Sequence, residues 1–172
     1  TLFDYLKARS FKEEDIIKSN VIKIDNKNKI KDYYYKRLIF PILDEGENII
    51  GFGARSLDKS LPKYINSPES NFFQKRNLLF NLAEAKNVAR KKNNLLICEG
   101  YMDVISLYQN GIKSVVAPLG TALTEEQLSL AWKYSSKPTI MFDGDKAGLH
   151  ASFKSALMAL HMITPKRFLQ FI

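Results

Sequence analysis

The chain has 172 residues, 45% of them hydrophobic and 26% charged, so it is long enough to bury a core and is not a disordered tail. Lysine and arginine outnumber acidic residues by 26 to 18, and the net charge of +8 favours a polyanionic partner such as nucleic acid. A single cysteine excludes an internal disulfide, and with only two histidines it excludes a zinc site made of these residues. No apolar run approaches the ~18 residues of a membrane span. We therefore expect no membrane partner and a reducing compartment, the cytoplasm.

The positive charge is concentrated in the first half of the chain. Residues 1–93 carry 19 basic and 12 acidic side chains, whereas residues 94–172 carry 7 and 6. The best candidate for a boundary is the pair Asn93 and Asn94, which follows a Lys-rich helical segment. The pattern predicts a basic domain over residues 1–92 and a nearly neutral domain over residues 93–172.

The basic domain is predicted to be a mixed subdomain built around a β-hairpin. In chain order we expect a helical segment, the two hairpin strands, an irregular stretch and a short helix, over residues 1–22, 37–43, 48–55, 58–76 and 82–92. Residues 44–47 supply the turn of the hairpin. Because proline cannot donate to a strand ladder, Pro41 places the first hairpin strand at an edge or a bulge.

The second domain alternates short apolar runs with helical segments. Strands are expected over residues 95–98, 114–117, 139–142 and 168–172, and helices over residues 102–109, 125–134 and 146–162. Thr124 and Gln127 have the spacing of a capping box. The last helix carries one apolar face, formed by Leu149, Phe153, Ala156, Leu157 and Leu160. This alternation predicts an α/β domain whose parallel sheet has helices on both faces, within a chain that is α+β overall.

Acidic residues follow two of the predicted strands. Glu99 comes after the first strand, and Asp143 and Asp145 come after the third. If the strands are neighbours, the carboxylates share one sheet edge, where charges ~4 Å apart repel by about 4 kcal/mol at an effective dielectric of 20. A hard divalent cation, Mg²⁺ or Mn²⁺, would relieve that repulsion, and Asp103 follows four residues after Glu99. The alternative, left open by spacing alone, is that these aspartates only cap helices or form turns.

Three motifs in the second half of the chain stand at residues 99–104 (Glu-Gly-Tyr-Met-Asp-Val), 118–121 and 142–148. They resemble the Toprim signature of a known family, the bacterial replicative DNA primases, which share this metal-binding domain with topoisomerases and some nucleases. The first half resembles the amino-terminal subdomain of the primase catalytic core, through residues 37–42, 50–55, 62–69 and 73–75. The resemblance implies that a Toprim parallel-sheet domain flanked by helices follows the basic subdomain.

The resemblance implies an activity with its cofactors and partners. It implies template-directed synthesis of short RNA primers on single-stranded DNA, by metal-dependent nucleotidyl transfer from ribonucleoside triphosphates, at the replication fork in the bacterial cytoplasm. The metal would be Mg²⁺ or Mn²⁺. In the family, a zinc ion and the contact with the replicative helicase belong to further amino- and carboxyl-terminal domains, and another acidic motif follows the last strand. We expect the chain to be a part of a longer polypeptide, truncated at the end of its Toprim domain.

The resemblance also assigns roles to individual residues. Glu99, Asp143 and Asp145 would be catalytic and, with Asp103, would bind the metal. A ridge that guides template and nucleotide would contain Arg37, Arg55, Lys63, Tyr64, Asn66 and Lys75. Tyr64 is expected either to stack on a base or to pack in the core, and Tyr33, Tyr34 and Tyr35 are interpreted as strand packing. The chain departs from the family at Ala54, where a glycine is usual. The alternative function is a non-catalytic or nuclease-type Toprim module that binds single strands.

Overall fold

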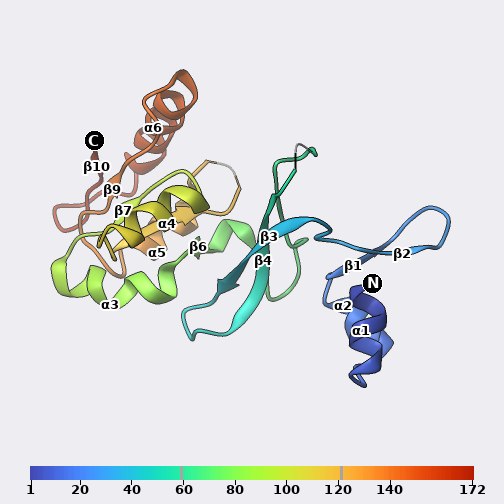
Figure 1. The fold of residues 1–172 in the computed structure, drawn as a ribbon. Helices are drawn as coiled ribbons and strands as arrows, with labels where there is room; N and C mark the ends of the chain where they lie inside the picture. The colour runs from blue at the N-terminus through green and yellow to red at the C-terminus, as the bar shows by residue number, and fades with distance from the viewer. Residues whose placement is uncertain (59, 121) are drawn as a thin grey trace. The chain divides into compact units, whose positions relative to one another are not determined.

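The computed structural model describes residues 1–58, 60–120 and 122–172, and their contacts group into two compact units (Figure 1). The first unit contains Thr1–Pro41 and Gly51–Pro68, and the second contains Ile42–Ile50 and Glu69–Ile172. Contacts therefore place the tip of the hairpin and residues 69–92 in the second unit. The domain boundary expected between residues 92 and 93 remains a prediction.

The first unit contains two short helices and two small antiparallel groups of strands. Its elements are α1 (Leu2–Ala8), α2 (Glu13–Lys18), β1 (Ile22–Ile24), β2 (Ile30–Asp32), β3 (Arg37–Leu43), β4 (Ile49–Ser56) and β5 (Tyr64–Asn66), of which β3 and β4 run on into the second unit. Strand β1 pairs with β2, and β3, β4 and β5 form a sheet in that order. The predicted hairpin is thus confirmed, with Pro41 on the edge strand β3.

Two sequence-based expectations for this unit were wrong. The continuous helix over residues 1–22 is interrupted, because Ser10 adopts a φ of 65° and Asn20 a φ of 59°, outside the helical region. The stretch expected to be irregular contains β5, which pairs Tyr64 with Arg55 and Asn66 with Gly53. Three residues give too short a run for strand periodicity to be visible in the sequence.

The second unit is built around a five-stranded sheet with the order β10-β9-β7-β8-β6. Its elements are η1 (Lys75–Asn77), β6 (Leu79–Phe80), α3 (Leu82–Lys92), β7 (Leu96–Ile97), α4 (Tyr101–Gln109), β8 (Val115–Pro118), α5 (Glu125–Ala131), β9 (Thr139–Ile140), α6 (Lys146–Ala159) and β10 (Gln170–Phe171). Strands β7 to β10 are mutually parallel, as predicted, whereas the unpredicted strand β6 pairs antiparallel with β8. The sheet is therefore mixed.

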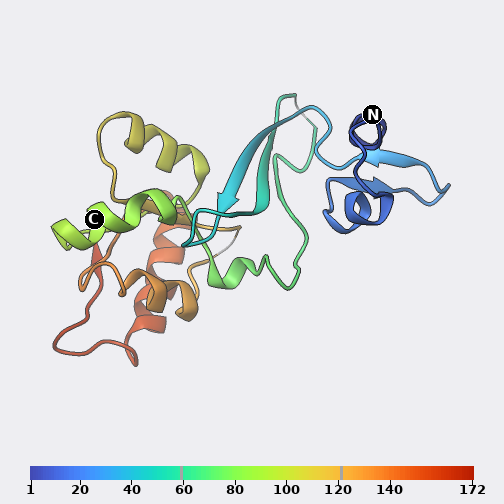
Figure 2. The same cartoon turned by 90° about the horizontal axis from the view of Figure 1, so that it is seen from below.

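Alternate residues of the central strands enter two separate apolar clusters, as expected for a sheet that is covered on both faces. Leu95, Ile97 and Val116 belong to one cluster, together with Leu128, Trp132 and Ile140. Cys98, Val115 and Ala117 belong to the other, together with Val104 of α4. Figure 2 shows the helices of this unit, coloured from green to red, from a second direction. Helices α3, α5 and α6 contribute residues to the first cluster, and α4 contributes to the second. The predicted covering of the parallel sheet is confirmed.

The apolar face predicted for the last helix does not enter this core. Leu149, Phe153, Leu157 and Leu160 are each more than half exposed, whereas Gly148, Ser155 and Ala159 are buried. Small side chains allow α6 to approach the rest of the unit closely. Helical periodicity predicted the apolar stripe, but the buried face is the one with small residues. Within the three described ranges, no helix combines the length and the apolar character needed to cross a bilayer.

Candidate functional site

Four acidic residues, Glu99, Asp103, Asp143 and Asp145, lie beyond the carboxyl ends of β7 and β9, and we call this group the acidic rim. Because β7 and β9 are parallel neighbours, with Ile97 opposite Ile140, their carboxyl ends lie at the same edge of the sheet. The rim is held across the two strands by a hydrogen bond of 3.0 Å, which the backbone N–H of Asp143 donates to Oε1 of Glu99. The structure therefore brings Glu99 and Asp143 together, as the sequence predicted.

Gly148 lies at the centre of this arrangement. A Cβ atom at Gly148 would stand 2.0 Å from the carbonyl oxygen of Asp143 and 2.6 Å from Oε1 of Glu99. The backbone N–H of Gly148 donates a hydrogen bond of 2.8 Å to Oδ1 of Asp145. Only glycine fits this contact, although inside a helix it costs about 1 kcal/mol relative to alanine. Gly148 is the last residue of the motif at residues 142–148, and a glycine inside a predicted helix is the sequence signal of this close contact.

Asp103 and Asp145 also serve as local caps. Asp145 is the N-cap of α6, and Oδ2 of Asp103 accepts a hydrogen bond of 3.0 Å from the backbone N–H of Gly100 at the start of α4. The capping interpretation that the sequence left open is thus correct for these two residues. Capping engages only one oxygen of each carboxylate in these bonds, so it does not conflict with a role in binding a cation. All four side chains of the rim are exposed.

The pKa of the Cys98 thiol is affected by the carboxylates of the acidic rim. Cys98 is fully buried at the end of β7. Burial, followed by the negative charges of Asp103 and Asp143, raises the pKa of this thiol to about 12. Both carboxylates therefore act on the same strand end. A buried, protonated thiol agrees with the structural role expected for this cysteine.

The donors of the rim fit a hard divalent cation by their chemistry, because they are all carboxylate oxygens. Among the described residues, no three acidic, histidine or cysteine side chains converge closely enough to hold a metal ion as they stand. The assignment of Glu99, Asp103, Asp143 and Asp145 as metal ligands thus remains a prediction. The motif at residues 118–121 ends at Thr121, which lies outside the described residues.

In the first unit, two basic residues of the predicted ridge, Arg55 and Lys63, lie beside the ring of a third ridge residue, Tyr64. The guanidinium carbon of Arg55 lies 6.0 Å from the centroid of the Tyr64 ring, and Nζ of Lys63 lies 5.7 Å from it. Tyr64 is 37% exposed, so its ring is not part of the core. Arg55 and Tyr64 are cross-strand partners on β4 and β5 and therefore project from the same face of the sheet.

The remaining ridge residues are placed less uniformly. Arg37 donates a hydrogen bond of 3.4 Å from Nη1 to the carbonyl oxygen of Lys63, and Asn66 lies on β5. Lys75 belongs to the second unit, where its Nζ lies 3.9 Å from a carboxylate oxygen of Glu69. Ala54 is fully buried and is the neighbour of Arg55 in β4, so its methyl group points away from the face that carries Arg55.

Comparison with known proteins gives two family matches and a consistent set of relatives. The family described as the DNA primase catalytic core, N-terminal domain, matches residues 1–86, and the Toprim domain family matches residues 93–167. A DNA primase of Clostridium acetobutylicum is 44% identical over 156 residues, which cover 89% of this chain and 25% of the relative. The chain spans between about a quarter and a third of the length of the curated relatives that it matches.

Solved structures show the same likeness. A DnaG primase catalytic domain bound to single-stranded DNA has a TM-score of 0.87 at 36% identity, with 96% of this chain and 55% of the other covered. The primase catalytic core of Escherichia coli has a TM-score of 0.85 at 37% identity, with 92% and 50% covered. The predicted fold class, a mixed subdomain followed by a Toprim sheet, is confirmed by this agreement.

Proposed function

We propose a catalytic function for this chain, which belongs to the DNA primase catalytic core family: it supplies the basic subdomain and the Toprim domain of an enzyme that synthesises RNA primers on single-stranded DNA. The observation that carries the proposal is the contact between two strand ends, where the backbone of Asp143 donates to the carboxylate of Glu99 beside Gly148. A mere turn or cap at either strand end would need no such contact. This hydrogen bond between the two strand ends supports a preorganised acidic site at the edge of the sheet.

The Toprim match implies in general terms that a divalent metal ion takes part. We assign Glu99, Asp103, Asp143 and Asp145 as the residues that would hold it, with Mg²⁺ or Mn²⁺ as the ion. When bound, such an ion lowers the pKa of an attacking hydroxyl and neutralises charge on transferring phosphoryl oxygens. The Asp143 N–H already holds one oxygen of the Glu99 carboxylate, whereas the other three carboxylates would move closer together to bind the ion.

The polyanion is assigned to the first unit. Arg55 and Lys63 flank the partly exposed ring of Tyr64, which gives one flat aromatic surface with cations beside it. A base stacked on that ring would place its phosphates near the lysine and the arginine, which is the usual arrangement of proteins that bind single strands. We assign Arg37 and Asn66 to the same track, and Lys75 to contact with nucleotide or nascent RNA.

The proposal extends to substrates and partners. The template is single-stranded DNA, as in the solved relative that was determined with it. Ribonucleoside triphosphates are the substrates, and the reaction takes place in the cytoplasm. A contact with the replicative helicase, and a zinc site, would come from parts of the longer primases that these 172 residues do not match. These assignments follow from family membership.

Primer synthesis in a longer primase polypeptide that carries this segment tests the function. With a single-stranded template, ribonucleotides and Mg²⁺, the wild type should make short RNA products. Glu99→Gln keeps a hydrogen-bond acceptor for Asp143 but removes the charge, so the rate should fall by at least about a hundredfold. Glu84→Gln, an exposed position on α3, serves as the matched control and should keep the rate. Equal rates in the two variants would refute the assignment of Glu99.

A second function, a Toprim module that binds single strands without catalysis, is favoured by one observation. In the described parts of the chain, no three potential ligands converge around a metal position. The same assay separates the two functions, because a binding module would retain strand binding yet make no primer under any divalent ion.

A further inference from the structure

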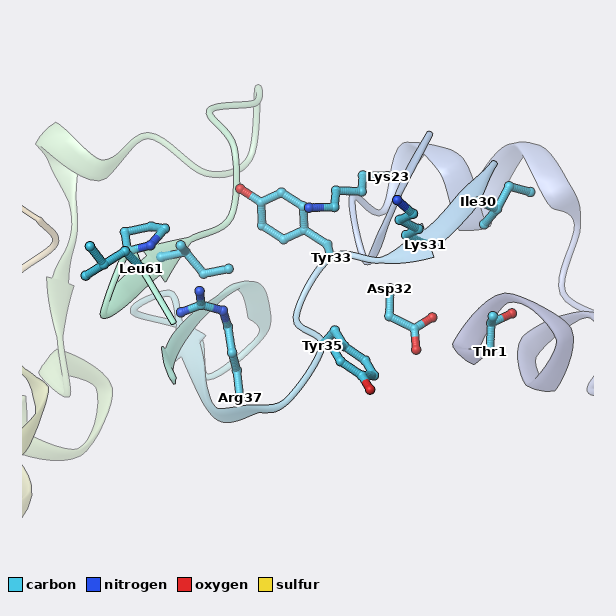
Figure 3. A pocket seen from close by; sticks show the side chains of 11 residues that line it. Thr1, Lys23, Ile30, Lys31, Asp32, Tyr33, Tyr35, Arg37 and Leu61 are labelled. Atoms are coloured by element: carbon cyan, nitrogen blue, oxygen red, sulfur yellow. The ribbon is translucent and has the colours of Figure 1, made fainter. Parts of the chain in front are cut away.

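A pocket of about 830 Å³ opens in the first unit, beside the hairpin formed by β1 and β2. It is separate from the face of Tyr64, which is not among its lining residues. Figure 3 shows Lys23, Tyr33, Tyr35 and Arg37 around the hollow, with Leu61 beside Arg37. The volume lies within the range of about 300–1,000 Å³ that is typical of small-ligand sites. The pocket is therefore large enough for a nucleotide unit.

Two tyrosines give the pocket its aromatic surface. Tyr33 is fixed, because its ring lies edge-on to Tyr34 with centroids 4.8 Å apart and its hydroxyl donates a hydrogen bond of 3.4 Å to the carbonyl oxygen of Asn66. Tyr35 is 67% exposed. The expected strand is wrong, because residues 33–36 form a turn; the expected packing holds for Tyr33 and Tyr34, whereas the ring of Tyr35 is left at the surface. An exposed ring on a pocket wall offers a face for stacking.

The charges that line the pocket are mainly positive. Lys31 is paired with Asp25 at 2.9 Å, and Oδ1 of Asp32 accepts a hydrogen bond from the backbone N–H of Leu2. Across the described ranges, neither Lys23 nor Arg37 forms an ion pair, and Arg37 donates only to a neutral carbonyl group. Two cations without an ion pair therefore line the pocket, against the single carboxylate of Asp32. Leu61, 87% exposed, adds apolar surface to the pocket beside Arg37.

This combination of groups selects the ligand. An aromatic face next to apolar surface suits a flat base, and the two unneutralised cations suit a phosphate. An acidic peptide would satisfy the cations but would leave the ring of Tyr35 uncovered. Arg37 lines the pocket and also donates to the carbonyl oxygen of Lys63, so one residue of the ridge assigned above belongs to the pocket wall as well. Arg37 is therefore the residue through which a strand on the ridge would enter the pocket.

We propose that this pocket binds one unpaired nucleotide of the single strand, with its base on Tyr35 and its phosphate between Lys23 and Arg37. The inference rests on the proposed function, because it extends the strand track beyond Tyr64. It adds a second aromatic position to that track. Lys23, Tyr33 and Tyr35 were not among the site residues expected from the sequence.

Binding of a fluorescent oligodeoxythymidylate of about twelve nucleotides to the 172-residue chain tests the proposal. Tyr35→Ala should weaken binding at least about fivefold, since stacking on one ring contributes about 1–3 kcal/mol, whereas Tyr35→Phe should bind like the wild type. Lys23→Gln should lower the salt dependence by about 0.7 in log–log slope, as expected for one lost phosphate contact. Lys27→Gln, on the same hairpin but outside the pocket, is the charge-matched control.

Lys63→Ala separates this proposal from the function on which it rests. If Lys63→Ala weakens binding while Tyr35→Ala and Lys23→Gln do not, the pocket proposal is overturned and the ridge stands. If the wild type does not bind the oligonucleotide, both fail. Thermal unfolding checks that each variant is folded, and Lys23→Gln, an exposed charge change, carries the test should Tyr35→Ala lose its fold.

A titration with thymidine monophosphate distinguishes a strand nucleotide from a free one. Under the proposal, the monophosphate competes only weakly with the oligonucleotide, because it lacks the ridge contacts. Saturable binding of the monophosphate that Tyr35→Ala abolishes, with oligonucleotide binding unaffected by the same change, would assign the pocket to free nucleotides. That result would overturn the strand assignment.

Discussion

The acidic rim and the basic ridge hold their charged groups in opposite ways. In the rim, Glu99, Asp103 and Asp145 each accept a hydrogen bond from a backbone N–H, so the main chain fixes the oxygens. In the ridge, Arg55 and Lys63 lie beside the face of an aromatic ring, where a long side chain keeps much of its freedom. A small ion needs oxygens at fixed distances, whereas a flexible polymer needs cations that can follow it. Each region has the rigidity that its proposed ligand requires.

The largest effect is expected at Gly148, where that main-chain rigidity is concentrated. Gly148→Ala should destabilise the chain by about 2 kcal/mol, because the overlap of the new methyl group with a carbonyl oxygen exceeds the gain in helix propensity of about 1 kcal/mol. Gly144→Ala is the matched control, since a Cβ there meets nothing within 4 Å, and it should change stability by less than about 0.5 kcal/mol. Denaturant unfolding measures both. Equal stability of the two variants would mean that the rim is not tightly built.

A smaller effect is expected where the two lysines of the predicted ridge are compared. Lys63→Ala should weaken binding of a single strand about fivefold at 0.1 M salt, from the loss of one phosphate contact. Lys75→Ala should have less effect, because this ammonium group already lies 3.9 Å from Glu69. Anisotropy titrations at several salt concentrations measure the slopes. A larger loss of affinity for Lys75→Ala than for Lys63→Ala would show that the ion pair with Glu69 does not reduce the contribution of Lys75 to single-strand binding.

The smallest effect concerns the hairpin that carries Lys23 and Lys31. The pKa of Asp25 is lowered to about 2, chiefly by its hydrogen bond with Lys31 and then by the backbone N–H groups of Lys29 and Lys27. Because the folded pKa lies below the unfolded value of about 3.9, the stabilisation is complete above about pH 4 and is lost as the pH falls to about 2.

Asp25→Asn should remove this part of the acid dependence and leave a flatter profile. Amide chemical shifts of residues 25–31, followed from pH 5 to about 2, report on the hairpin directly. An unchanged profile in the variant would show that Asp25 does not hold the turn.

Much of this molecule follows from local sequence signals. Helix α3 was predicted with its observed bounds, and the capping box of Thr124 and Gln127 is present. Glu99 and Asp143 were predicted to meet because residues after parallel strands share an edge, which depends on strand order and little else. These predictions succeeded where the signal was a helix cap, the periodicity of apolar residues or the parallel direction of two strands.

The failures arose where tertiary packing decides. Strand β6 has two residues and exists only because Leu79 and Phe80 pair with Pro118 and Ala117, nearly forty residues away. The buried face of α6 contains Ser155 and Ala159, whose small side chains allow close packing against the rest of the unit. Their size affects which face is buried only once the helix packs against other elements. The pocket beside Tyr35 depends on a turn at residues 33–36 that three consecutive tyrosines do not signal. No local pattern carries this information.

The central claim, that the acidic rim holds a divalent cation, is tested most directly by titrating the chain with Mn²⁺ and following the free ion by electron paramagnetic resonance. We predict a site that Glu99→Gln weakens at least about tenfold, because one charged ligand is lost, and that Glu84→Gln leaves unchanged. Equal binding by these two variants, or no Mn²⁺ binding by the wild type, would contradict the account.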